Sequence, residues 1–308
     1  MVTADSTVDI DTSAVAAKVT RRLGLQALGP AGEGVDFVVY HVGSRTLGDL
    51  ALRVPRHRRY IAPYGQVDAG DLVRQEHEIA GRLARHGLPV SAPVDLVTCE
   101  DGLLVSLARY VPSDGRPVPG QDIGAFLARL HQVEPWPVRL AYQAPGDFGE
   151  FLVSRVHDRH KALSRHAADL PDLPDGAVLR DVMDHEDSTA RLLHLDIRRQ
   201  NLLGTGGRLA AAVDWSNALM GPPLMELARV CEYALLPDNG LNAEAVLEGY
   251  TATDGQRLDT WSAAALLHRL DTALMLALVF HSVAPHPARA RDLTHRSRHL
   301  LERLNAAV

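Results

Sequence analysis

The first third of the chain alternates apolar and polar residues in the way that half-buried β-strands do. Residues 32–43 (GEGVDFVVYHVG) and 46–56 (TLGDLALRVPR) both show this two-residue period. Glycines at 43 and 48 suit a turn between the two segments, so we expect a hairpin. Residues 89–112 predict a second pair of short strands around a turn at 100–102.

Two helices are predicted beside these hairpins. Residues 12–28 carry apolar positions at helical spacing, and we expect this helix to stop at Gly29. Residues 68–87 predict the second helix, with Asp71 as its N-terminal cap and Gly87 at its end.

This order of elements predicts an α+β fold, with a small antiparallel sheet and one packed helix in a first lobe. The Pro- and Gly-rich segment 111–120 is typical of a hinge. We therefore expect an N-terminal lobe over 1–110 and a larger, mainly helical C-terminal lobe over 121–308. Short β-like runs interrupt the helical pattern only at 191–195 and 208–215.

Composition excludes several classes of function. The chain has 308 residues, enough for two lobes, and its hydrophobic fraction of 46% is ordinary for a globular protein. A net charge of −6 argues against a nucleic-acid-binding protein, which usually has a basic surplus. Cys99 and Cys231 form no disulfide or zinc motif, which favours a reducing cytoplasm.

We also expect no membrane span and no signal peptide. The N-terminus begins acidic, whereas a signal peptide begins cationic. The most apolar window, 273–280, is shorter than the roughly 20 residues that a helix needs to cross a bilayer, and it predicts a buried helix. The expected protein is cytoplasmic, a monomer or weak dimer, without nucleic-acid or membrane partners.

The segment 191–203, RLLHLDIRRQNLL, places His194, Asp196 and Asn201 inside a frame of leucines. It is either a polar turn between two strands or a site where a carboxylate is held for chemistry. Phosphoryl transfer needs an aspartate that accepts the proton of a hydroxyl, and an amide and a second carboxylate that hold Mg²⁺. Asp214, at the end of the following β-like run AVDW, completes this set. His194 is then expected to be a structural clamp of the catalytic loop.

The segments HLDIRRQNLL and AVDWSNALMGPPLMELA resemble those of the aminoglycoside and macrolide phosphotransferases, which share the protein-kinase-like fold. The N-terminal segments GEGVDFVVYHVG and LALRVPR are similar to the nucleotide-covering hairpin and strand of the macrolide enzymes. The resemblance extends over residues 30–231. It implies that Asp196 is the catalytic base and that Asn201 and Asp214 bind magnesium.

The chain departs from that family at two positions of these segments. Leu195 stands where the family usually has glycine, and Glu226 stands where it often has aspartate. We expect Glu226 to hydrogen-bond the catalytic loop. Arg198 and Arg199 follow the base and face either the γ-phosphate, the acceptor or water, and Arg199 is taken as a catalytic candidate.

A kinase also needs a cation at the nucleotide phosphates, usually a lysine on the third strand. Lys18 and Lys161 are the only lysines, so we expect Arg53 to take this role. An arginine can bind two phosphate oxygens at once. Its expected helix partner is Glu76, with Glu78 as the second candidate.

Other residues are expected to contact the nucleotide through the backbone. The partial glycine loop GEG at 32–34 makes Gly34 a candidate beside the phosphates. The purine edge is expected to meet the backbone of Arg109, Tyr110 and Val111.

No sequence motif identifies the residues that would bind the acceptor substrate. A cationic acceptor would need acidic groups, and aromatic residues would offer platforms. The candidates in the second lobe are Glu232, Asp238, Tyr233 and Trp261, with Glu244 and Asp271 also available.

The predicted function is a Mg²⁺-dependent O-phosphotransferase that moves the γ-phosphoryl group of ATP or GTP to a hydroxyl of an antibiotic-like small molecule. An aminoglycoside, a macrolide or a peptide antibiotic is the leading acceptor, with resistance by inactivation as the role. One alternative is a metabolic or biosynthetic kinase of a small alcohol such as choline, homoserine or a thiosugar. The alternative from another class is a catalytically silent binding module with the same fold.

Overall fold

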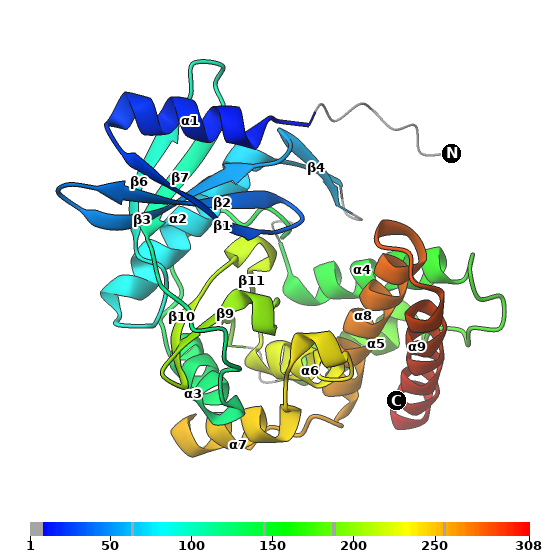
Figure 1. Ribbon diagram of the computed structural model, residues 1–308. Coiled ribbons are helices and arrows are strands. Elements are labelled where there is room, and N and C mark those ends of the chain that lie inside the picture. Colours follow the sequence, from blue (N-terminus) through cyan, green and yellow to red (C-terminus); the bar gives the residue numbers. More distant parts are fainter. Residues whose placement is uncertain (1–8, 63–64, 144–145, 187–188, 255–256) are drawn as a thin grey trace. The chain divides into compact units, whose positions relative to one another are not determined.

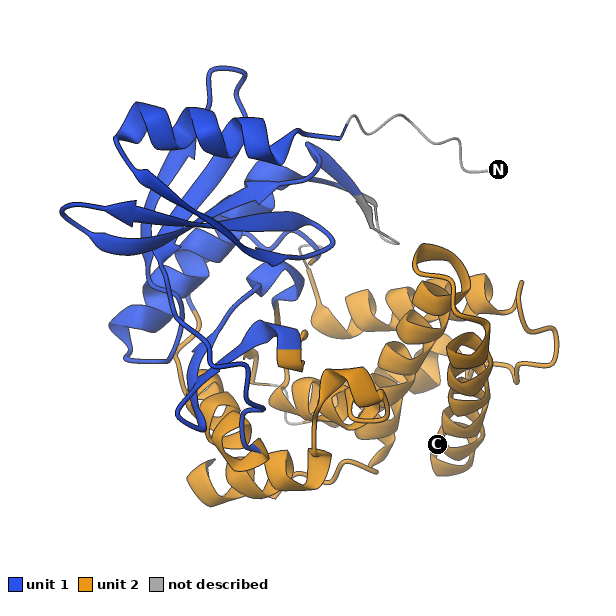
Figure 2. Ribbon diagram, viewed as in Figure 1, with its two compact units in different colours: residues 1–119, 136–142, 200–218 blue, residues 120–135, 143–199, 219–308 orange. Residues whose placement is uncertain are grey.

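The computed structural model describes residues 9–62, 65–143, 146–186, 189–254 and 257–308 (Figure 1). The chain divides into two compact units (Figure 2). Unit 1 comprises residues 1–119, 136–142 and 200–218. Unit 2 comprises residues 120–135, 143–199 and 219–308. The lobe limits expected from the sequence stay a prediction.

Unit 1 contains a five-stranded antiparallel sheet with the strand order β1-β2-β3-β7-β6. The strands are β1 (Gln26–Glu33), β2 (Phe37–Ser44), β3 (Gly48–Pro55), β6 (Pro93–Thr98) and β7 (Leu104–Arg109). Strands β2 and β3 form the expected first hairpin, and β6 and β7 form the second. The α+β class with an antiparallel N-terminal sheet is therefore confirmed.

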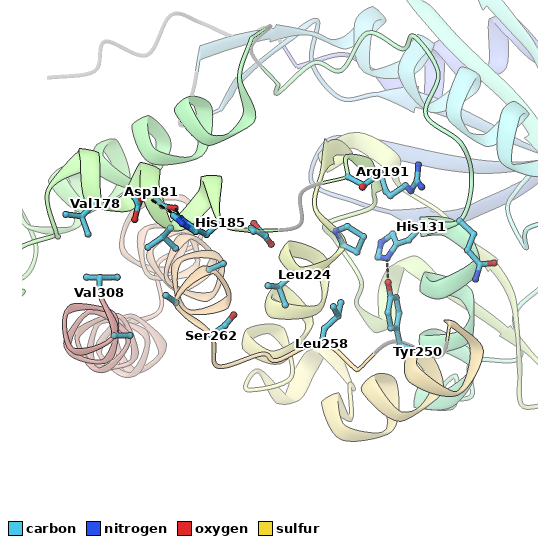
Figure 3. A pocket seen from close by; sticks show the side chains of 18 of the residues that line it. His131, Val178, Asp181, His185, Arg191, Leu224, Tyr250, Leu258, Ser262 and Val308 are labelled. Atoms are coloured by element: carbon cyan, nitrogen blue, oxygen red, sulfur yellow. Dashed lines mark hydrogen bonds and ion pairs between the residues drawn. The ribbon is translucent and has the colours of Figure 1, made fainter.

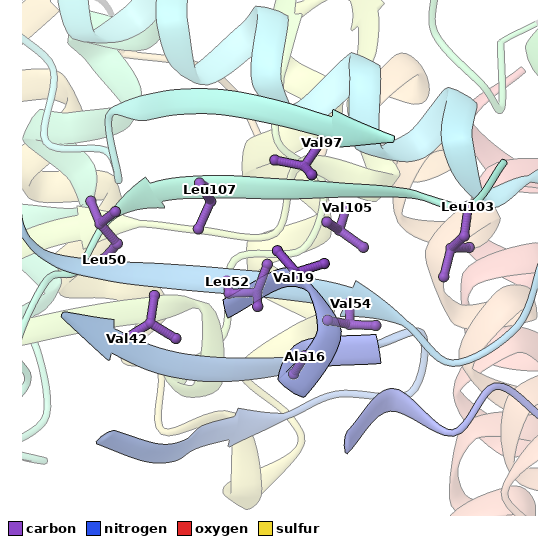
Figure 4. Close-up of a cluster of buried hydrophobic side chains, with 10 residues drawn as sticks. All are labelled: Ala16, Val19, Val42, Leu50, Leu52, Val54, Val97, Leu103, Val105 and Leu107. Carbon is purple, nitrogen blue, oxygen red and sulfur yellow. The ribbon is translucent and has the colours of Figure 1, made fainter. Parts of the chain in front are cut away.

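The two faces of this sheet pack against different helices (Figure 1). Leu50, Leu52 and Val54 of β3 point to one face because alternate side chains of a strand share a side, and there they pack against α1 (Thr12–Leu23) (Figure 4). The opposite face packs against α2 (Ala69–Arg85). Arg53 lies between Leu52 and Val54, so the same alternation turns it toward the α2 side.

Two predictions about the first helix were wrong. Helix α1 ends at Leu23 rather than running to residue 28, because Gly24 adopts φ 63° and its N–H caps the carbonyls of Arg21 and Thr20. Residues 26–28, predicted as the end of this helix, instead begin the edge strand β1. Register shifts at its glycines and proline, together with an exposed surface, hide the strand period in the sequence.

The cap of α2 was also assigned wrongly. Asp68, not Asp71, accepts a hydrogen bond from the Gly70 N–H at 2.8 Å. The residues before it form a hairpin of β4 (Arg59–Ala62) and β5 (Gly65–Asp68), which the sequence analysis did not predict. Gly87, with φ 70°, follows the end of the helix as expected.

A second hairpin of unit 1 lies directly after the catalytic-loop motif. It consists of β9 (Leu202–Thr205) and β10 (Arg208–Ala212), joined by Gly206 and Gly207. Their φ angles of 61° and 75° suit a two-residue hairpin turn that glycine adopts without strain. The short 3-10 helix η2 (Trp215–Asn217) follows.

Unit 2 is mainly helical. Its α-helices are α3 (Gly120–His131), α4 (Phe148–Leu163), α5 (Gly176–Asp184), α6 (Pro223–Tyr233), α7 (Ala243–Asp254), α8 (Ala263–Leu278) and α9 (Pro287–Ala307). A π-helical turn, η4 (Val279–Val283), extends α8, and the 3-10 helix η3 (Pro237–Asn239) follows α6. Strands β8 (Arg191–Leu193) and β11 (Leu219–Gly221) pair with each other and flank the motif. The 3-10 helix η1 (Arg199–Asn201) ends it.

One helical stretch, Ala263–Val283, has the length and the mean hydropathy of 1.6 that a membrane-crossing helix needs. However, 67% of its apolar window is buried inside the protein. This burial is typical of a core helix, as expected from the sequence for residues 273–280.

Candidate active site

The loop that carries the expected base belongs to unit 2 and is held by one carboxylate. Glu226, in the first turn of α6, is fully buried. Its Oε2 accepts a hydrogen bond from the His194 N–H at 2.9 Å, and its Oε1 accepts one from the Leu195 N–H at 2.6 Å. The glutamate thus reaches the catalytic loop, as the sequence led us to expect.

The charge of Glu226 is stabilised by neighbouring groups. Burial by itself raises the pKa of this carboxyl, but the His131 hydrogen bond and the nearby His131 and His194 rings hold the pKa below its usual value. The Nε2 of His131 lies 3.3 Å from Glu226, and its Nδ1 lies 3.1 Å from the Tyr250 hydroxyl. A charged acceptor therefore fixes the backbone of the loop.

Leu195 adopts the left-handed conformation that glycine normally occupies. Its φ is 58°, and a non-glycine residue in this region costs about 1–2 kcal/mol. The side chain is buried, with 1% exposed, so packing and the hydrogen bond to Glu226 offset this strain. The turn expected from the family pattern thus forms without its glycine.

His194 takes part in the turn through its ring. The Asp196 N–H donates to its Nδ1 at 3.2 Å, so the ring proton is on Nε2 when the histidine is neutral. His194 is fully buried. Both facts support the clamp role proposed for it.

Asp196 is buried, and its two oxygens have different neighbours. The Tyr233 hydroxyl donates to Oδ1 at 3.2 Å, and the Nη2 of Arg229 donates to the same hydroxyl at 3.0 Å. The Nε of Arg198 lies 3.2 Å from Oδ2. Burial raises the pKa of Tyr233, so its hydroxyl stays protonated and can donate. Tyr233 therefore contacts the expected base itself.

The expected magnesium ligands belong to unit 1, at the open end of the β9–β10 hairpin. The Val213 N–H donates to the carbonyl of Asn201 at 2.9 Å, which brings the residues at the two ends of the hairpin together. Asp214 has φ 67°, and its Oδ1 accepts from the Ser216 hydroxyl at 2.6 Å.

Arg53 joins Glu76 and Asp214 within unit 1. Its Nη1 forms an ion pair with Glu76, and its Nη2 donates to Asp214 Oδ1 at 2.9 Å. The guanidinium also lies 4.0 Å from the centre of the Phe37 ring, which limits its motion. Glu78, the second candidate partner, instead accepts a hydrogen bond from the Trp136 indole at 3.3 Å.

Gln75 is a site residue that the sequence did not reveal. It is 2% exposed, and its Nε2 donates to the carbonyls of Trp215 at 2.6 Å and Ser216 at 3.3 Å. Its Oε1 accepts from the Ala141 N–H at 2.7 Å. The available signal was an amide on the apolar stripe of a predicted helix, between Leu72 and Ile79. Gln75 holds the turn that follows Asp214.

The donor set of unit 1 fits a magnesium ion. Asn201 and Asp214 offer an amide and a carboxylate oxygen, and Mg²⁺ is usually bound by one or two carboxylates together with substrate phosphates. Over the described ranges, no group of three His, Cys, Asp or Glu side chains could hold a metal by itself. A Mg²⁺ ion here would therefore need water or phosphate oxygens as further ligands.

The backbone expected at the purine edge is partly used by the fold. The Arg109 N–H donates to Ala92 at 2.8 Å, its carbonyl accepts from the Ser91 hydroxyl at 2.7 Å, and the Tyr110 N–H donates to Asp49 at 3.1 Å. The Arg109 carbonyl can accept a second hydrogen bond, so its expected contact with the purine stays a prediction. Among the described residues, neither the Tyr110 carbonyl nor Val111 forms a hydrogen bond. The expected contact of these backbone groups with the purine therefore stays a prediction.

Gly34 lies in the turn between β1 and β2. Its N–H donates to the Phe37 carbonyl at 2.8 Å, and its own carbonyl accepts from the Nε of Arg56 at 2.9 Å. The partial glycine loop is thus the tip of a hairpin.

The expected acceptor residues do not share one open surface. Glu232 is fully buried between Arg269 and Arg296, and Asp271 is fully buried between two other arginines. Asp238 pairs with Arg289. Three arginines surround the Trp261 ring, namely Arg269 at 4.0 Å, Arg303 at 4.4 Å and Arg296 at 5.9 Å. Glu244 is exposed in the first turn of α7.

A cavity of about 940 Å³ lies elsewhere in unit 2 (Figure 3). His131, Arg191, Leu224 and Tyr250 are among the residues that line it, and residues 194–199 are not. The cavity is therefore no part of the wall around Asp196.

Comparisons with known proteins agree with this arrangement of elements. No curated protein sequence matches the chain. A crystal structure of a thermostable mutant of aminoglycoside phosphotransferase APH(4)-Ia, with ADP and hygromycin B, is similar in fold. Its TM-score is 0.62 at 15% identity, over 94% of this chain and 98% of that one.

Two further crystal structures have the same fold. Macrolide 2'-phosphotransferase MphH from Brachybacterium faecium has a TM-score of 0.56 at 18% identity, over 94% of this chain and 97% of that one. A choline/ethanolamine kinase family protein from Mesorhizobium loti has a TM-score of 0.59 at 19% identity, over 97% and 99%. The kinase-like fold expected from the sequence is confirmed.

The profile of the phosphotransferase enzyme family matches residues 28–267, which is most of the chain. This match confirms both the resemblance seen in the sequence and the expected enzyme class. The chain belongs to the phosphotransferase enzyme family.

Proposed function

We propose that this phosphotransferase moves the γ-phosphoryl group of ATP or GTP to a hydroxyl of a small molecule, with Mg²⁺ as cofactor. The observation that carries the proposal is the buried carboxylate of Asp196 on a loop whose backbone Glu226 holds at two N–H groups. A base fixed in this way can orient an acceptor hydroxyl before the reaction begins.

In the proposed reaction, the hydroxyl oxygen forms a bond to the γ-phosphorus as the bond to the β–γ bridging oxygen breaks. Asp196 accepts the hydroxyl proton, and a nucleoside diphosphate leaves. Arg53, held by Glu76, is proposed to bind the phosphates. Asn201 and Asp214 are proposed to hold a Mg²⁺ ion, which when bound supplies positive charge at the transferring group.

The remaining nucleotide contacts are proposals of the same kind. Gly34 would lie beside the phosphates, and Tyr110 and Val111 would meet the purine through backbone groups that the fold leaves available. Arg199 would face the γ-phosphate or the acceptor.

For the acceptor we propose an antibiotic-like molecule, with resistance as the role. The related structures include an enzyme with bound hygromycin B and a macrolide 2'-phosphotransferase, and these names support the class. A choline/ethanolamine kinase family protein has an equally similar fold and supports the alternative, a kinase of a small metabolic alcohol. A cytoplasmic monomer or weak dimer without nucleic-acid partners is part of the proposal, supported by the net charge of −6.

Asp196→Asn tests the proposal because it removes the proton acceptor and keeps the shape of the side chain. We expect nucleoside diphosphate release with an acceptor to fall by about 10²–10⁴-fold, since a general base contributes this much. Binding of a fluorescent nucleotide and the thermal midpoint are expected to stay near the wild-type values. Turnover retained by the variant would rule out Asp196 as the base. Slow, Mg²⁺-dependent hydrolysis of the nucleotide by the wild-type protein would exclude the silent-module alternative.

A further inference from the structure

The buried carboxylates of unit 2 are already neutralised by the protein. Glu232 Oε1 lies 2.6 Å from the Nε of Arg269 and 2.8 Å from the Nη2 of Arg296. A carboxylate compensated by two guanidinium groups has no net attraction left for a cationic ligand.

Asp271 repeats this arrangement between α4 and α8. Arg155 Nη2 lies 2.7 Å from Oδ2, and Arg159 Nη1 lies 2.6 Å from Oδ1. Glu226 is engaged by the loop N–H groups and His131, as described above. Glu186, which lines the cavity of unit 2, lies 3.0 Å from the Nε2 of His268. Asp196, also buried, contacts the Tyr233 hydroxyl and the Nε of Arg198.

The side chains next to Asp196 are basic. Arg198 Nε lies 3.2 Å from Asp196 Oδ2, and the Arg198 side chain is 36% exposed. The Nε itself is buried against Asp196, so a ligand can reach only the other atoms of this partly exposed side chain. The aliphatic part of Arg199 lies against Gly240, in the turn whose Asp238 pairs with Arg289.

We propose that the acceptor is a neutral or anionic hydroxyl compound, not a polycation, and that the guanidinium of Arg198 contacts it beside the reacting hydroxyl. A polycation is bound through carboxylates that lack an internal partner, whereas the buried Glu232 and Asp271 are each paired with two arginines and Glu226 is bound by the loop N–H groups. An arginine next to the base repels a cation and donates to hydroxyl, carboxylate or phosphate oxygens. The inference rests on the proposed function and narrows its acceptor away from antibiotics with several amino groups and from choline-type alcohols.

The acceptor charge is tested with compounds that share one skeleton. Glucose, glucosamine and glucuronate differ in charge, and kanamycin adds a polycation; each is assayed for nucleoside diphosphate release above the Asp196→Asn background. We expect kcat/KM for glucose or glucuronate to exceed the values for glucosamine and kanamycin at least tenfold. A preference for glucosamine or kanamycin would overturn the inference and leave the proposed function standing. Release that never exceeds the Asp196→Asn background would reject the proposed function, and the inference with it.

The role of Arg198 is tested separately with Arg198→Ala and Arg198→Lys, using the better acceptor of that series. We expect Arg198→Ala to raise the acceptor KM about tenfold with the nucleotide KM within twofold of wild type, and lysine to recover part of the loss. Arg165→Ala, at an exposed arginine after α4, is the control and should change neither constant. A raised nucleotide KM with an unchanged acceptor KM would place Arg198 at the phosphates and overturn this contact.

Discussion

Tyr233 constrains one oxygen of Asp196 while Arg198 lies near the other. The tyrosine is 6% exposed, and Arg229, itself buried, orients its hydroxyl from the preceding turn of α6. The hydroxyl therefore donates to the carboxylate instead of to solvent. Through this contact Tyr233 positions the carboxylate of Asp196, the proposed base.

Tyr233→Phe should lower kcat about 10- to 100-fold, because a hydrogen bond to a charged group is worth about 1.5–3 kcal/mol. We expect the nucleotide KM to remain within twofold of wild type, since the removed hydroxyl contacts the base. Steady-state kinetics with the nucleotide varied at saturating acceptor separates the two constants. If kcat fell and the nucleotide KM rose by similar factors, the hydroxyl would serve the packing of unit 2 as a whole.

At Leu195, the packing of the side chain outweighs an unfavourable backbone angle. Leu195→Ala is expected to lower the free energy of unfolding by about 2–5 kcal/mol, the usual cost of a buried leucine. Leu195→Gly should be about 1 kcal/mol more stable than the alanine variant, because φ 58° suits glycine. Urea unfolding of the three proteins measures both steps. An alanine variant as stable as the glycine variant would show that the backbone carries no strain at this residue.

At the scale of elements, two helices hold the two groups of site residues. Helix α6 contributes Glu226, Arg229 and Tyr233 to the loop of Asp196, all within unit 2. Helix α2 contributes Gln75 and Glu76 to the neighbourhood of Asp214, all within unit 1. In each case a helix built on an ordinary apolar stripe fixes a loop through its few buried polar side chains.

Gln75→Leu keeps the size of the side chain and removes its three hydrogen bonds. The carbonyls of Trp215 and Ser216 and the N–H of Ala141 then lose their partner, at about 1–3 kcal/mol for each group left unsatisfied. We expect a lower thermal midpoint and a raised nucleotide KM. Arg85→Ala, on the exposed side of the same helix, is the control and should stay within about 0.5 kcal/mol of wild type. An unchanged nucleotide KM in Gln75→Leu would show that the turn after Asp214 does not need the hydrogen bonds of Gln75.

For the whole molecule, four buried or half-buried titratable groups contribute to the dependence of stability on pH. Burial lowers the pKa of His77 and of His281, which therefore resist protonation in the folded state. Burial opposes ionisation of Asp271, but Arg155 and Arg159 outweigh it and hold the pKa of this carboxyl below its usual value, as for Glu226. All four groups have a lowered pKa in the folded protein.

A lowered pKa in the folded state means that the unfolded chain binds the proton first as the pH falls. The stability contributed by the histidines is complete above a pH of about 6.5 and decreases below it, and that of the carboxyls decreases below about 4.5. We expect the thermal midpoint to be level from pH 8 to 7 and to fall in these two steps. Replacing His77 and His281 by asparagine should remove the first step, whereas His299→Gln, at an exposed histidine, should keep it. A first step that survives in the double variant would assign it to other groups.

Much of the fold could be predicted because its signals are local. The alternation in β2 and β3, the glycine turn between them and the apolar stripe of α2 each act over a few neighbouring residues. Strand β1 and the β4–β5 hairpin were not predicted, because β1 is an exposed edge strand and the strands of the hairpin are only four residues long, too short to show a clear alternation.

The sequence by itself determined which residue types stand at the catalytic spacing, namely Asp196, Asn201 and Asp214, since this spacing is a property of one short loop and one hairpin. Only the tertiary structure decided their neighbours. Tyr233 meets Asp196 from a separation of 37 residues, and Gln75 meets Trp215 from 140. Chain spacing cannot predict such contacts, because they depend on how helices pack. The same packing places Glu232 between arginines, which makes a residue expected at the acceptor into an internal ion pair.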